Sequence, residues 1–189
     1  MVKVNKNIFD QITNDYIVQE LLYQHRSLSI LNESSVNIIR IVTVFINDTI
    51  KMVTAALRIG GEGDFTDNVE HEDGSGMTVV GIKHDGSLLP VGYHSNGQKV
   101  YMTYKGILFK DYKIPKFHEM ISLAIREHTK YPRTRFIAWD FTLDENEEII
   151  VMEYNTKSPG VLYYQYVNGP LFGEYIEEIL NFVAARKGR

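Results

Sequence analysis

Three oxygen-bearing side chains in the last third of the sequence have the types and spacing of a metal or acid–base site. Asp140 and Glu153 are 13 residues apart in a stretch that alternates like a β-hairpin, and Asn155 follows two residues after Glu153. If the turn is centred on Asn146 and Glu147, Asp140 faces Glu153 directly across the two strands. We therefore expect both carboxylates to lie side by side on one face of the hairpin.

Two facing carboxylates repel each other, because their Cβ atoms are only about 5 Å apart across a ladder. A shared proton, an arginine or a metal ion can compensate this repulsion. A shared proton would raise one pKa and support general acid–base chemistry. Two carboxylates with an asparagine oxygen instead form an all-oxygen set, which suits Mg²⁺ and not Zn²⁺. A solvated strand face whose acids happen to align is the alternative, although the hydroxyl and amine groups of residues 156–158 favour a bound polyphosphate.

Strand alternation divides the hairpin into a polar and an apolar face. The first face is expected to contain Ala138, Asp140, Thr142, Val151, Glu153 and Asn155. The second face is expected to contain Ile137, Trp139, Phe141, Leu143, Ile150, Met152 and Tyr154. The second face reads as a core face, so both carboxylates should point away from the core together.

The elements that position this hairpin are mostly strands joined by turns. Strands are expected over 36–46, 50–59, 77–82, 88–93, 99–104, 135–143 and 148–154. Within residues 15–31, a short strand at 16–18 is expected to lead into a helical patch with Leu21, Leu22, His25 and Leu28 on one side. Helices are expected over 115–128 and 172–185, the second burying Phe172, Tyr175, Ile176, Ile179, Leu180 and Val183. The pattern predicts an α+β fold with a mainly antiparallel sheet and flanking helices, in one domain over 1–189.

The composition excludes several classes of function. The chain has 189 residues, of which 44% are hydrophobic and 23% charged, as in ordinary globular proteins. Its formal charge of −4 argues against nucleic-acid binding. The absence of cysteine excludes disulfides, thiolate nucleophiles and cysteine-bound zinc. No apolar run approaches the roughly 20 residues of a membrane helix, so we expect no membrane span and a cytoplasmic protein.

The hairpin resembles the metal-binding hairpin of ATP-grasp enzymes. The resemblance depends on the pattern D-x12-E-x-N-T-x-x-P-G, formed by Asp140, Glu153, Asn155, Thr156, Pro159 and Gly160. A resemblance to the sugar-transfer-associated ATP-grasp group extends to segments 34–44, 55–68 and 138–140. The arrangement of these segments is also similar to that of glutamate-adding ligases of the α-L-glutamate ligase type. The resemblance implies the carboxy-terminal lobe of the ATP-grasp fold, with the amino-terminal lobe absent. It also implies a carboxylate–amine ligase that depends on ATP and Mg²⁺ (or Mn²⁺), in polysaccharide or cell-envelope synthesis.

The same resemblance implies roles for individual residues. Asp140, Glu153 and Asn155 would hold the metal, and Arg40 and Arg58 would steady the transferring phosphoryl group. Asn68 would contact the nucleotide phosphates or the metal, the backbone of Gln19, Glu20 and Leu21 would read adenine, and Glu20 would reach the ribose. From residue type alone, Arg40 stands among apolar neighbours of a strand and needs an anionic partner. A structural salt bridge and a phosphate contact both remain open for it.

The implied partners are ATP and a carboxylate or sugar-linked acceptor. D-alanine ligases of this superfamily have an arginine two residues before the metal-binding aspartate, where this chain has Ala138. Because the lobe that supplies the phosphate-binding lysines is expected to be absent, a second polypeptide or lobe could complete the site. A non-catalytic binding or assembly module derived from the ATP-grasp fold is the alternative, and a metal-dependent hydrolase is a more general one.

Overall fold

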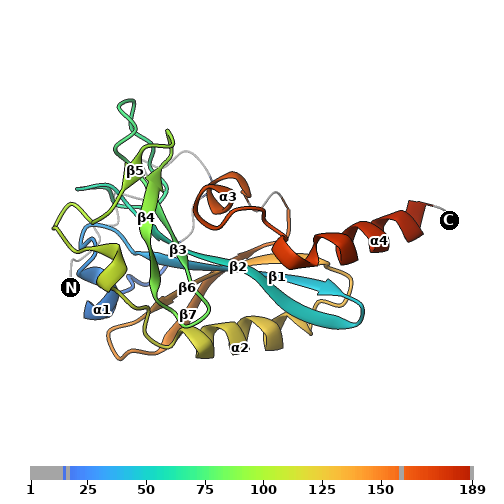
Figure 1. The fold of residues 1–189 in the computed structure, drawn as a ribbon. Coiled ribbons are helices and arrows are strands. Elements are labelled where there is room, and N and C mark those ends of the chain that lie inside the picture. Colours follow the sequence, from blue (N-terminus) through green and yellow to red (C-terminus); the bar gives the residue numbers. More distant parts are fainter. Residues whose placement is uncertain (1–14, 16–17, 158–159, 188–189) are drawn as a thin grey trace.

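The computed structural model describes residues 15, 18–157 and 160–187 of the chain. Its centre is a seven-stranded sheet in the order β5-β4-β3-β2-β1-β6-β7, with every neighbouring pair antiparallel (Figure 1). The strands are β1 (Ile38–Ile46), β2 (Thr49–Ile59), β3 (Thr78–Ile82), β4 (Leu88–His94), β5 (Lys99–Val100), β6 (Phe136–Leu143) and β7 (Ile149–Asn155). The helices are α1 (Arg26–Ser29), α2 (Phe117–His128), α3 (Leu162–Asn168) and α4 (Ile176–Lys187), with short 3₁₀ turns η2 (Phe109–Asp111) and η3 (Gly173–Tyr175). The expected α+β class is confirmed.

Two helices cover opposite faces of the sheet (Figure 1). Helix α2 buries residues spaced three or four apart, Phe117, Met120, Ala124 and His128, against β1, β2 and β6. Helix α3 packs on β2, β3 and β4 on the other face. Successive strand residues alternate between the two faces, so Leu57 belongs to the large core under α2 and Ala56 to the smaller cluster under α3.

A two-residue turn fixes the register of the hairpin formed by β1 and β2. Asn47 and Asp48 both have positive φ, at 46° and 58°, as a two-residue type I′ turn requires. Ile46 therefore pairs with Thr49, and the ladder extends along both strands to the pair Ile38 and Arg58. This turn places the two arginine-bearing strands next to each other.

The β6–β7 hairpin reaches the expected pairing of Asp140 with Glu153 by an unexpected route. The loop contains three residues, 145–147, and the carbonyl of Glu148 accepts from the amide of Asp144 at 3.0 Å. This loop alone would put the ladder one residue out of the expected register. A β-bulge opposite the step from Asp140 to Phe141 restores the register, because Met152 is an extra residue in β7.

The bulge overturns part of the expected division into faces. Val151 lies opposite Phe141 and Ile150 lies opposite Thr142, so each of them lies on the other face from the one expected. Met152 was expected on the core face, but its side chain is 44% exposed. The apolar residues of β6 do face the core, as expected.

Several helix and strand predictions were wrong. The helix expected over 172–185 begins at Ile176 after a 3₁₀ turn, and none of its residues 176–185 is buried; Leu180 is 59% exposed. Residues 18–24 form no helix or strand apart from an isolated bridge at Gln24, and residues 16 and 17 of the expected strand lie outside the described residues. The strand expected over 99–104 is only two residues long. Helix α3 was not expected.

Candidate functional site

An arginine–carboxylate ion pair joins the central strands on the face under α3. Arg40 of β1 lies directly opposite Asp140 of β6. Its Nε donates to Asp140 Oδ1 at 2.5 Å and its Nη2 donates to Oδ2 at 2.5 Å, which makes the pair bidentate. Both residues are buried. Of the three ways to compensate the facing acids, the structure therefore supplies an arginine for Asp140.

A second arginine approaches the same carboxylate from β2. Arg58 Nη1 lies 3.8 Å from Asp140 Oδ2, and Arg58 Nη2 lies 2.8 Å from Asp67 Oδ2. The contact with Asp67 is close enough for an ion pair but lacks hydrogen-bond geometry. Arg58 Nε is buried and has no hydrogen-bond partner in the part of the chain that the structure describes. Arg58 thus keeps an unused donor.

Glu153 and Asn155 are less enclosed than Asp140. They stand two residues apart on β7, and Asn155 Nδ2 donates to Glu153 Oε1 at 2.8 Å. The Glu153 side chain is exposed and Asn155 is partly exposed. The two facing acids therefore have different surroundings: Asp140 is fixed by arginines, whereas Glu153 is open to solvent.

These side chains line one cavity of about 500 Å³, here called the arginine cavity. It is lined by Gln19, Ile38, Arg40, Arg58, Asp67, Asn68, Asp140, Met152, Glu153, Asn155 and Gly160. Its volume lies within the range of small-molecule sites, roughly 300–1,000 Å³. The structure brings seven of the nine expected site residues to this cavity. The other two, Glu20 and Leu21, are exposed and are not among the lining residues.

Asp67 is the lining carboxylate that the sequence analysis missed. It directly precedes Asn68 in the glycine-rich loop 60–76, a position that already drew attention for phosphate or metal contact. The signal available in the sequence was a carboxylate directly before Asn68. Its ion pair with Arg58 fixes this end of the loop over the arginine cavity.

Burial and charge shift the pKa values of several groups here. Burial by itself lowers the pKa of Arg40, but its hydrogen bond to Asp140 and the charges of Tyr164 and Asp140 outweigh it, so that the pKa is raised. Burial raises the pKa of Asp67, against the opposing effect of Arg58. Burial also raises the pKa of Tyr164, whose ring centroid lies 5.9 Å from Arg40 Cζ. Arg40 is therefore a permanent cation beneath α3.

The oxygen donors do not form a preformed metal site. No three His, Asp or Glu side chains among the described residues are grouped closely enough to hold a metal ion. Both oxygens of Asp140 already accept from Arg40. A carboxylate oxygen has a second lone pair, however, and Glu153 and Asn155 border the cavity with further oxygens. The chemistry of the donors fits Mg²⁺, provided that Asp140 accepts a cation beside Arg40.

Comparison with known families gives the chain its class. The sequence model of the sugar-transfer associated ATP-grasp family matches residues 9–180, and the chain belongs to this family. Membership in the family implies that the protein binds ATP. Searches of curated proteins and of solved structures found no match. Within the described ranges 18–157 and 160–187, no helix has the length and hydrophobicity needed to cross a membrane.

Proposed function

We propose that the protein binds ATP with Mg²⁺ in the arginine cavity and takes part in a carboxylate–amine ligase reaction. The observation that carries the proposal is the convergence of two arginines and Asn68 on the same cavity as Asp140, Glu153 and Asn155. Guanidinium groups bind phosphate oxygens in a fork-like geometry. In a ligase of this kind the donor carboxylate attacks the γ-phosphorus and ADP leaves. The amine then displaces phosphate to form the amide.

The charge of the arginine cavity makes a cation necessary for this reaction. Three carboxylates, those of Asp67, Asp140 and Glu153, face two arginines, so an ionised cavity is net negative. A polyphosphate would be repelled from it without a further positive charge. Bound Mg²⁺ supplies that charge and neutralises phosphate oxygens. Asp140, Glu153 and Asn155 would hold it, while Arg58, with its unused Nε, would bind the terminal phosphate.

The remaining assignments extend the same proposal. Backbone at Gln19 to Leu21 would bind adenine with Glu20 at the ribose, and the chain would serve as one ATP-grasp lobe, completed by a second lobe or polypeptide. A carboxylate or sugar-linked acceptor and a role in polysaccharide or cell-envelope synthesis are parts of this proposal. A non-catalytic binding or assembly role is the second candidate, favoured by the bidentate pair of Arg40 and Asp140, which also serves as a structural link between β1 and β6.

Thermal unfolding with and without nucleotide tests the proposal. Ligand at one hundred times Kd stabilises the folded state by about 2.7 kcal/mol, which corresponds to roughly 5–10 °C in Tm for a chain of this size. We expect Mg²⁺ and ATP together to raise Tm, and ATP without Mg²⁺ to raise it less. Glu153→Gln and Arg58→Gln should remove most of the shift.

Two matched variants control for loss of charge alone. Glu145 is exposed in the loop of the same hairpin, and Arg126 is exposed on α2. Glu145→Gln and Arg126→Gln should keep the full shift. If nucleotide does not raise the Tm of the parent protein, or if it raises the Tm of all four variants by the same amount, nucleotide does not bind in the arginine cavity. ATP binding without ADP formation across a panel of donor carboxylates and amines would favour the non-catalytic role.

A further inference from the structure

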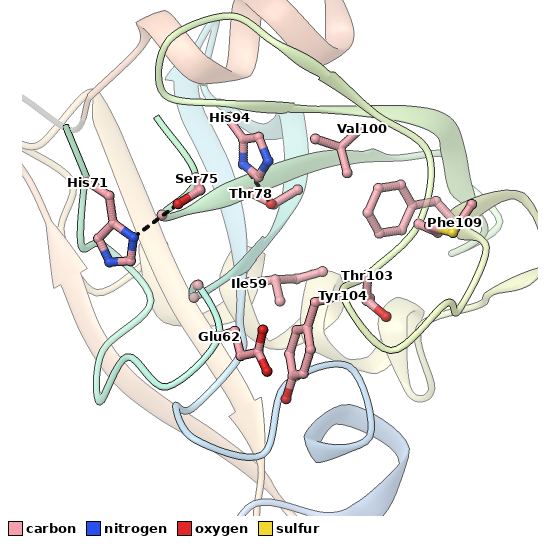
Figure 2. A pocket seen from close by; sticks show the side chains of 14 residues that line it. Ile59, Glu62, His71, Ser75, Thr78, His94, Val100, Thr103, Tyr104 and Phe109 are labelled. Carbon is pink, nitrogen blue, oxygen red and sulfur yellow. Dashed lines mark hydrogen bonds between the residues drawn. The ribbon is translucent and has the colours of Figure 1, made fainter. Parts of the chain in front are cut away.

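A second cavity borders the same loop as the arginine cavity, and its strand residues lie on the opposite face of the sheet. This second cavity, of about 440 Å³, is lined by loop 60–76, by parts of β3 and β4 and by segment 100–109 (Figure 2). Within the loop, Asp67 and Asn68 border the arginine cavity, whereas Glu62, His71 and Ser75 border the second cavity. The loop is thus a shared wall between the two cavities.

The shared wall is held in a defined shape. Asn32 is completely buried, and its Nδ2 donates to the carbonyls of Gly60 and Gly61, at 3.0 Å each. The loop closes where the Met77 amide donates to the Val69 carbonyl at 2.8 Å. A Cβ on Gly76 would lie 2.2 Å from that carbonyl oxygen, so only glycine fits the closure. The second cavity is therefore preformed and does not require a ligand to order it.

The charge of the second cavity is opposite to what an anionic ligand needs. None of its lining residues is lysine or arginine, and Glu62 provides its one carboxylate. Behind the lining, Asp64 Oδ1 lies 3.0 Å from His71 Nε2, and Asp64 Oδ2 accepts from the Gly61 amide at 3.1 Å. Lys105 also lies outside the lining, 5.8 Å from the Tyr104 ring centroid, but it is paired with Glu33 at 2.9 Å. A carboxylate or phosphate in this cavity would therefore meet a carboxylate and no unpaired cation of the lining. A cationic group would find partners.

The cavity is polar at one side and apolar at the other. Figure 2 shows Glu62 and His71 on the side away from Val100 and Phe109. Thr103, which is 7% exposed, lies on the same side as Phe109, and its hydroxyl accepts from the Ile107 amide at 3.3 Å. Tyr104 lines the same cavity and is 46% exposed. The lining thus suits a molecule with a cationic head and an apolar body.

We infer that the second cavity binds the amine substrate, an organic primary amine whose ammonium group contacts Glu62 and whose apolar body packs against Val100 and Met102. The claim that the bound amine is a substrate rests on the proposed ligase function. The claim that the cavity binds an amine rests only on its lining residues. The strand residues of this cavity lie on the face of the sheet under α2, and the arginines lie on the face under α3, so loop 60–76 at the end of β2 is the segment that both cavities share.

Three probes with one body and different heads test the inference. 2-Phenylethylamine, 2-phenylethanol and 3-phenylpropanoate are titrated into isotopically labelled protein without nucleotide, and binding is followed by NMR. We expect the amine to bind at least tenfold more tightly than the other two and to shift the signals of His71 and Tyr104. Glu62→Gln should abolish the preference, whereas Glu72→Gln, in the same loop but outside the lining, should retain it.

Several results would overturn the inference. These are tighter or equal binding of 3-phenylpropanoate, a preference for the amine that survives Glu62→Gln, and no binding of the amine at millimolar concentration to protein with a well-dispersed spectrum. Thermal shifts with Mg²⁺ and ATP on the same samples separate this inference from the proposed function. Nucleotide binding without amine binding refutes the second cavity alone. Amine binding without nucleotide binding supports the second cavity and refutes the ligase proposal.

Discussion

Asp140 is the residue on which the charges of the arginine cavity depend. It compensates Arg40 at 2.5 Å and lies 3.8 Å from Arg58, all within a largely buried region. Removing one partner of a buried ion pair leaves an uncompensated charge, which typically costs about 3–5 kcal/mol. We expect Asp140→Asn to lose stability in this range, as measured by urea unfolding. Neutral apolar replacement of a whole pair is often tolerated.

The double variant Arg40→Met with Asp140→Leu is the control for that prediction. It should recover at least half of the stability lost by Asp140→Asn, but it should not bind nucleotide because it lacks both Arg40 and Asp140. Equal losses in the single and double variants would show that the pair stabilises the fold through its shape and not through its charge.

His128 gives the protein a pH dependence that its hydrogen bonds make predictable. Its Nδ1 lies 2.7 Å from Thr43 Oγ1 and its Nε2 lies 2.9 Å from the Thr134 carbonyl, while Thr43 Oγ1 also accepts from Trp139 Nε1 at 2.9 Å. The neutral ring satisfies this network, with Nε2 as the donor and Nδ1 as the acceptor. Burial lowers the pKa of His128, against the opposing effect of its bond to Thr134.

The sign of the effect follows from proton binding. Between the lowered folded pKa and the unfolded value of about 6.5, the unfolded chain binds more protons, so stability falls as the pH falls through that window. We expect His128→Gln to remove this part of the pH dependence of the unfolding free energy. His118→Gln, at an exposed position of the same helix, should leave it unchanged. An identical pH profile for His128→Gln would contradict the assignment.

At the scale of elements, helix α3 is fixed on β2 and β3 by its last residue, Asn168. Asn168 Nδ2 donates to Thr54 Oγ1 at 2.7 Å and to the Ala55 carbonyl at 2.9 Å. A Cβ on Gly81 of β3 would lie 2.2 Å from Asn168 Oδ1. We expect Gly81→Ala to displace α3 and to destabilise the protein by about 1–3 kcal/mol. Hydrogen exchange of residues 162–168 should become faster.

Asn168→Ala distinguishes the clash from the loss of these hydrogen bonds. It removes the bonds without adding volume, so it should speed exchange in α3 and leave β3 protected. If the amides of α3 exchange as slowly in Gly81→Ala as in the parent, α3 docks without needing glycine at this position.

Elements whose determinants are local could be predicted from the sequence, and those that depend on distant partners could not. The adjacent strands expected over 36–46 and 50–59 and the helix expected over 115–128 depend on local signals, the turn residues Asn47 and Asp48 and a helical spacing of apolar residues, and these elements were confirmed. Helix α3 is only seven residues long, and it is positioned by contacts with β2, β3 and β4. Its sequence therefore carried little periodicity to detect.

In the candidate site, too, features with local determinants could be predicted and features that depend on distant residues could not. The pairing of Asp140 with Glu153 was expected because both stand in one hairpin, but it holds only because the bulge at Met152 offsets the register set by the loop. The partner of Asp140 was not, because Arg40 is 100 residues away in the sequence and strand alternation does not give the order of strands in a sheet. The ion pair between Arg58 and Asp67 was missed for a similar reason, since it depends on how loop 60–76 folds back over the strands.

At the scale of the whole molecule, α4 projects from one end of the sheet (Figure 1). Its residue Glu178 accepts from Asn47 at 2.8 Å and pairs with Lys51 at 2.9 Å, yet Leu180 is mostly exposed. We expect Leu180→Gln to change stability by no more than about 0.5 kcal/mol, as is usual for surface positions. The comparison is Leu57→Gln in the core, which should unfold or strongly destabilise the protein. A loss above 1 kcal/mol for Leu180→Gln would show that α4 packs more closely in solution.

The bulge at Met152 has a consequence for comparing this hairpin with others. Because Met152 is the extra residue, its deletion would leave every pair of the hairpin unchanged, including Asp140 with Glu153. Deletion of Tyr154 would instead shift Asn155 along β6 and turn its amide to the opposite face. Homologues with 11 or 12 residues between the two acids can therefore present the same oxygen atoms. Alignments of such proteins should permit a one-residue gap before the glutamate and none after it.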